Sequence, residues 1–195
     1  MQTLSALTEL DSINIMLSTI GESPVSSLSA DESTVDVSLA RQILREVTIQ
    51  VQETGWHFNT EVNWLMAPTA ITGEILIPAN CVQIDTSGPD ASLDVAMRGS
   101  RLYDRVAHSY SFTKPIAVDM ILLLDFTDIP QAARHYITIR AARVLQQRMV
   151  GSDQLGAFTE KDELRARAAL KKLDANTADY NILKDSWSVA RVLTR

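Results

Sequence analysis

The chain has 195 residues, of which 46% are hydrophobic and 22% are charged, and its formal net charge is −6. These proportions exclude a mainly disordered chain. The longest apolar run, Met120 to Leu124, is far shorter than the roughly 20 residues that cross a bilayer. The first residues also lack the basic and apolar regions of a signal peptide. We therefore expect neither export nor a membrane anchor.

A first helix is predicted near the start of the chain. Apolar residues recur at helical spacing from about Ser5 or Thr8 to Ile20. Thr8 and Asp11 have the spacing of a capping pair, and Gly21 is a typical residue after a helix end. The segment thus carries both a start and a stop signal.

A second, longer helix is predicted to begin among the capping side chains of residues 29–33 and to reach Thr54. Gly55 is expected to end it. The residues of its apolar stripe are Ala40, Ile43, Leu44, Val47 and Val51.

Short strands are predicted from Trp56 to Phe126. Trp56 and Phe58 alternate as they would on one face of a strand. We expect four to six antiparallel strands, separated by turns rich in Gly, Pro, Ser and Asp. The segments with the strongest strand pattern are residues 73–78, 81–86, 92–97 and 116–126.

Two more helices are predicted in the last third of the chain. Asp128 is a candidate N-cap before Pro130, and that helix should run to Met149 or Val150. Thr159 with Asp162 is expected to open the next helix. Residues 181–195 lack a strong helical period but keep large apolar side chains, which indicates docking on the parent domain or on a partner.

The charge is unevenly distributed. Residues 1–129 hold 6 Lys and Arg against 17 Asp and Glu, whereas residues 130–172 hold 9 against 4. This asymmetry is compatible with head-to-tail contact between copies, with an acidic surface past which a polyanion slides, or with two differently charged partners. Solvated charges on long helices are the simpler interpretation.

No motif points to catalysis or to a bound ion. His57, His108 and His135 lack the spacing of a helical metal pair, and Cys81, the only cysteine, is expected to be a small buried hydrophobe. We predict no catalytic residue, no metal and no cofactor. The acidic residues of the predicted strands and turns, among which no spacing selects a catalytic pair, are Asp85, Asp94, Asp104, Asp119 and Asp125.

Several short strings, in order, resemble one known family. IGESPV at residues 20–25, GWHFN at 55–59 and YDR at 103–105 are followed by an arginine-rich helix ending near Gly151 and by LTR at 193–195. This combination is similar to tail tubular protein A of short-tailed bacteriophages. The resemblance spans essentially the whole chain.

The resemblance implies an α+β fold, a helical bundle of about four helices with an inserted antiparallel β lobe. Residues 1–55 and 127–180 would form the bundle, 56–126 the lobe and 181–195 a C-terminal docking tail. It further implies a virion tail protein, made in the host cytoplasm, that forms a twelve-subunit adaptor ring between the portal protein and the tail nozzle (tail tubular protein B). Tail fibres would attach nearby, and genomic DNA would pass through the channel without sequence-specific binding.

The expected partner interface joins the tail to the arginine-rich helix. Trp187 is the candidate anchor because an aromatic side chain in a partner pocket can dominate interface energy. The residues assigned to this interface are Trp187, Val189, Val192, Leu193, Arg195, Arg140, Arg143 and Arg148. We predict no enzyme. Two alternatives stay open: an adaptor that also hydrolyses host capsule or cell-wall polysaccharide, and a cytosolic regulatory domain.

Overall fold

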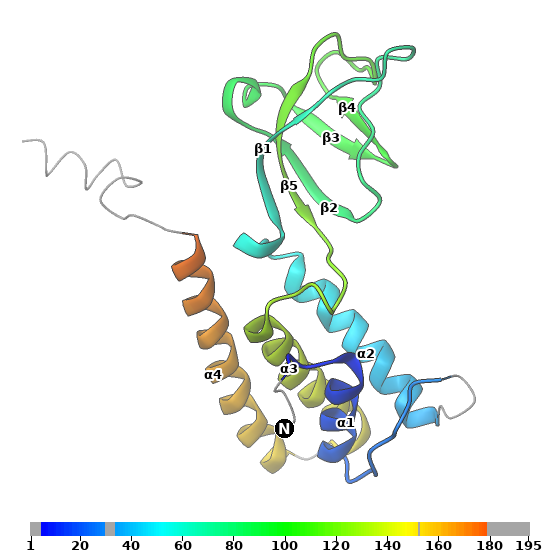
Figure 1. Cartoon of the computed structure of the whole chain (residues 1–195), viewed down its shortest axis with the longest axis vertical. Coiled ribbons are helices and arrows are strands. Elements are labelled where there is room, and N and C mark those ends of the chain that lie inside the picture. Colours follow the sequence, from blue (N-terminus) through cyan, green and yellow to red (C-terminus); the bar gives the residue numbers. More distant parts are fainter. Residues whose placement is uncertain (1–4, 30–33, 152, 179–195) are drawn as a thin grey trace, which may run out of the picture.

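The computed structural model describes residues 5–29, 34–151 and 153–178. A group of helices lies at one end of the molecule and a β lobe at the other (Figure 1). The helices are α1 (Glu9–Thr19), α2 (Val35–Gln52), α3 (Gln131–Met149) and α4 (Asp153–Thr177). Because the lobe lies between α2 and α3 in the chain, the prediction of an α+β fold with an inserted antiparallel lobe is confirmed.

The start of α1 follows the predicted capping pattern. The hydroxyl of Thr8 accepts a hydrogen bond from the Asp11 amide (3.1 Å), and the Asp11 carboxylate accepts one from the Thr8 amide (3.0 Å). The Thr8 hydroxyl also donates to the Asp11 carboxylate (2.6 Å), and this hydrogen bond, followed by that from the Thr8 amide, lowers the pKa of Asp11. At α2 the N-cap is Thr34, one residue beyond the predicted group, of which residues 30–33 lie outside the described part.

Helix α3 is the centre of the helical core. It packs against α1, α2 and α4, and its Ala133, Ile137 and Leu145 are fully buried. A buried hydrogen bond joins the hydroxyls of Thr138 and Ser12 at 2.9 Å and fixes α3 against α1. The predicted stripe of α2 is buried in the same cluster.

The lobe contains two small antiparallel sheets. The first has the order β1-β5-β2, with β1 (Thr60–Met66) and β2 (Cys81–Thr86) at its edges and β5 (Ile116–Leu122) between them. The second pairs β3 (Val95–Arg98) with β4 (Arg101–Asp104). Residues 73–78, predicted as a strand, form only isolated bridges from Glu74 and Leu76. The lobe has its own buried cluster, which includes Cys81 as predicted, and burial raises the pKa of that thiol.

Three sequence predictions of local structure are wrong. Trp56 and Phe58 do not alternate on a strand, because the chain forms a short 3-10 helix, η2 (His57–Asn59), before β1 begins. Asp128 does not cap α3; Pro130 holds the N-cap position. Helix α4 begins at Asp153 rather than near Thr159, since one glycine inside a helix costs only about 1 kcal/mol.

Asp90 fastens the loop after β2 to the central strand. It lies in the 3-10 helix η3 (Gly88–Asp90), and its carboxylate accepts hydrogen bonds from Lys114 Nζ (2.6 Å) and the Ala117 amide (3.0 Å). The hydrogen bond from Lys114, followed by that from Ala117, lowers the pKa of Asp90. A carboxylate with a lowered folded pKa stabilises the fold above its unfolded pKa, about 3.9, and this contribution is lost as the pH falls through the folded value.

We therefore expect Asp90→Asn to reduce the acid sensitivity of the protein. Its free energy of unfolding, measured in urea, should fall less between pH 7 and pH 3 than that of the wild type. Asp94→Asn is the matched control, because Asp94 makes only an exposed ion pair with Arg105. An equal loss of stability on acidification in wild type and Asp90→Asn would contradict this role.

Candidate interaction sites

The junction between helices and lobe is held by the side chain of Gln52, the last residue of α2. Gln52 is 1% exposed. Its Nε2 donates to the Leu124 carbonyl (3.0 Å), and its Oε1 accepts from the Leu124 amide (2.8 Å). One amide thereby pairs with both backbone groups of a residue that returns from the lobe.

Asn59 makes similar hydrogen bonds at the point where the chain enters the lobe, just before β1. Its Nδ2 donates to the carbonyls of Gln52 (3.0 Å) and Leu122 (2.9 Å), and its Oδ1 accepts from the Trp56 amide (2.9 Å). The entry to β1, the exit of β5 and the end of α2 therefore share one hydrogen-bond network. We call it the junction clamp and define it by Gln52, Asn59 and Leu124.

The GWHFN string supplies the backbone geometry of this junction. Gly55 has a φ of 72°, and a Cβ atom there would lie 2.7 Å from Ile121 Cδ1. Trp56 donates its indole N–H to the Val51 carbonyl (2.7 Å), and both Trp56 and Phe58 pack partly against the helical core. These two aromatics thus fix the junction to the helical core from outside a strand.

An open cleft of about 500 Å³ lies beside the junction clamp, between α2 and the chain that leaves β5. Apolar side chains that line it include Leu44, Ile49 and Phe126, and Arg41 and Arg45 also border it. Arg41 pairs with Glu9 at 3.4 Å. Arg45 is exposed, and we find no ion-pair partner for it in residues 5–29, 34–151 and 153–178. Asp125 lines the cleft as well as Glu9, so the cleft offers an apolar surface with charges of both signs, among which Arg45 is an exposed cation.

The edge strand β1 exposes apolar side chains on the lobe. Val62, Trp64 and Leu65 are 64%, 53% and 65% exposed. The pairing register with β5 shifts between Glu61 and Trp64, and Asn63 at the bulge has a φ of 54°. Exposed apolar residues on an edge strand mark a contact surface or an aggregation hazard.

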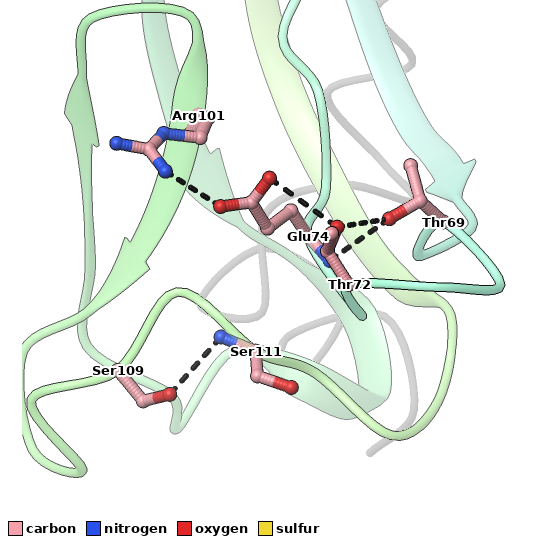
Figure 2. Close-up of polar contacts among 6 residues, drawn as sticks. All are labelled: Thr69, Thr72, Glu74, Arg101, Ser109 and Ser111. Atoms are coloured by element: carbon pink, nitrogen blue, oxygen red, sulfur yellow. Dashed lines mark hydrogen bonds and ion pairs between the residues drawn. The ribbon is translucent and has the colours of Figure 1, made fainter.

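The far end of the lobe carries a polar cluster (Figure 2). The two carboxylate oxygens of Glu74 accept hydrogen bonds from Arg101 Nη1 (2.5 Å) and the Thr72 hydroxyl (3.3 Å), and Thr72 in turn contacts Thr69 at 2.7 Å. The guanidinium of Arg101 also lies 4.3 Å from the centre of the Tyr110 ring. Both oxygens of Glu74 are paired, so this cluster holds loops together.

The predicted arginines have partners inside the chain. Arg143 Nε lies 2.5 Å from Glu163 Oε2 and ties α3 to α4, while Arg148 pairs with Glu46 at 3.1 Å. Arg140 donates to the Tyr136 hydroxyl (3.2 Å). Arg148 thus pairs with the acidic first half of the same chain. The other predicted interface residues, Trp187, Val189, Val192, Leu193 and Arg195, lie outside the described residues.

Within residues 5–29, 34–151 and 153–178, no three His, Cys, Asp or Glu side chains are arranged to hold a metal ion. The sheet does bring Asp85 opposite Asp119, a proximity that the sequence did not select. The Asp85 carboxylate accepts a hydrogen bond from the Thr86 amide, and the Asp119 carboxylate accepts one from the Asn63 amide, both at 2.8 Å. No helix of the described chain is long and apolar enough to cross a membrane.

Two structured ends, a hydrogen-bonded junction and exposed apolar surfaces are the features of a component of a larger assembly. A family model described as "Tube: Tail tubular protein" matches residues 10–180. The chain therefore belongs to the tail tubular protein family, and it is a structural protein of the phage tail. It is also 30% identical over 156 residues to tail tubular protein A of Klebsiella phage KP34. The aligned region covers 80% of this chain and 81% of that protein. The resemblance found in the sequence is confirmed.

Proposed function

We propose that the protein is the adaptor ring of the phage head-to-tail connector. In this role twelve copies join the portal protein to the tail nozzle and extend the DNA channel, with tail fibres attached nearby. The role is purely structural and takes place in the virion, after synthesis in the host cytoplasm. Membership of the tail tubular protein family supports the proposal.

The junction clamp is the observation that carries this function. An adaptor must keep its two binding ends in a fixed relation. The clamp joins the segment that enters the lobe and the segment that leaves it to the end of α2. Backbone groups paired in this way do not exchange easily with water, since leaving them unpaired costs about 1–3 kcal/mol each. The bundle and the lobe are therefore suited to contact different partners.

The channel surface is proposed to be acidic. A conduit should repel phosphate, because each Lys or Arg contact strengthens non-specific binding to DNA. Arg143 and Arg148 support this view, since both are neutralised by carboxylates of the same chain. The excess of acidic residues before residue 130 supplies the repelling surface. DNA then passes without sequence-specific contacts.

Residues 181–195 are proposed to dock on the portal, with Trp187 as the anchor. Electron microscopy of the full chain mixed with the portal protein of the same phage tests both statements. We expect a twelve-subunit ring seated on the portal, which is lost from the portal when residues 181–195 are deleted. Tail residues far from the portal, or a truncated chain that binds it equally well, would overturn the docking assignment. A chain that forms no ring on the portal would overturn the adaptor itself.

A further inference from the structure

The β1 edge carries exposed apolar side chains, which we call the knob and define as Val62, Trp64 and Leu65. Trp64 and Leu65 are consecutive in the strand and project from opposite faces of this edge. Its bulge is fixed by the Asn63 amide, which donates to Asp119 Oδ1 (2.8 Å), and by the Asn63 Oδ1, which accepts from the Ser87 hydroxyl (3.1 Å). A bulge whose backbone is held in this way loses little conformational entropy on docking. Glu61, exposed beside the knob, adds a negative charge.

The cleft is complementary to the knob in chemistry. Its apolar lining from Leu44, Ile49 and Phe126 matches apolar side chains, and its volume of about 500 Å³ has room for an aromatic one. Arg45, at the border of the cleft, has the charge opposite to that of Glu61. The acidic residues Glu9 and Asp125 also line the cleft, and Glu9 is already paired with Arg41. Acidic and basic groups beside matching apolar surfaces favour one register of contact.

The knob and the cleft lie at opposite sides of the molecule. The sheet order places β1 at one edge and β2 at the other, and Asn80, the residue before β2, lines the cleft. In Figure 1, β1 lies on the same side as α4, whereas β2 and α2 lie on the other side. One subunit therefore cannot fill its own cleft with its own knob. Two different patches on opposite sides are what a head-to-tail ring contact requires.

We propose that the β1 edge of one copy docks into the cleft of the next copy, with Trp64 as the anchor and Glu61 facing Arg45. This inference rests on the proposed ring and names the contact that would close it. The partner is a second copy of this chain, because both halves of the contact, with matching charges, occur on one molecule. Each added copy presents a new knob and a new cleft, so the contact propagates until the ring closes.

Crosslinking between copies tests the contact. Two full-length chains, both carrying Cys81→Ala, receive Glu61→Cys and Arg45→Cys respectively, and circular dichroism checks their folding. A short bismaleimide is then added to the mixture. We expect heterodimers to form about tenfold faster than in a control mixture of Ile71→Cys with Arg45→Cys, because docking raises the effective concentration of the two thiols. Ile71 is a suitable control because it is 97% exposed and lies in the same lobe.

A second variant tests the anchor. Trp64→Ala in the Glu61→Cys chain should reduce heterodimer formation to the control rate, whereas Ile71→Ala should leave it unchanged. Equal rates for the test and control mixtures would overturn the proposed contact. If rings appear by electron microscopy without this crosslink, only the contact is wrong. If neither the crosslink nor a ring on the portal is seen, the ring proposal fails as well.

Discussion

Gln52→Leu should lower the free energy of unfolding by about 3 kcal/mol, since it leaves the amide and the carbonyl of Leu124 without their partner. Leucine has a similar size and is apolar, so the loss reports the hydrogen bonds more than the packing. Gln52 is 1% exposed, and water therefore cannot easily replace its amide. Urea denaturation at neutral pH measures the change.

Gln42→Leu is the matched control for this variant. Gln42 is exposed on the same helix, and a surface substitution of this kind changes stability by less than about 0.5 kcal/mol. Equal stabilities of the two variants would show that the junction clamp contributes nothing. A loss confined to faster hydrogen exchange in residues 122–126 would show that the clamp holds only the exit of the lobe.

Local signals in the sequence predicted much of the helical part. The Thr8 and Asp11 pair, the stripe of α2 and the stop at Gly55 all depend on residues within one or two turns of each other, and each is found in the structure. Such short-range patterns encode helices well. The order of helices and strands was therefore predictable, and so was the α+β class.

The junction clamp was not predictable in the same way. Gln52 and Leu124 are 72 positions apart, and the sequence contains no periodicity that pairs them. The one available signal was a polar residue directly after the apolar stripe of α2, next to a glycine-containing break. The cleft and the Asp85–Asp119 pair likewise depend on strand pairing, which a single sequence does not specify.

A second substitution with a large expected effect on stability lies in α4, because this helix packs against the rest of the protein mainly along one side. Its Ala166 and Leu170 are buried in the helical core, and the Asp174 carboxylate accepts the His57 amide at 2.7 Å near the junction. Leu170 is completely buried. We expect Leu170→Ala to lower the free energy of unfolding by about 3 kcal/mol, through lost burial and the cavity left behind.

Leu164→Ala is the control on the same helix, because Leu164 is 59% exposed and its truncation should change stability by less than about 0.5 kcal/mol. Urea denaturation gives the global effect, and hydrogen exchange shows whether α4 loosens first. Residues 181–195 follow α4 in the chain, so under the proposed function Leu170→Ala should also weaken portal binding with the tail sequence unchanged. Normal portal binding by a destabilised Leu170→Ala chain would mean that the tail docks without support from α4.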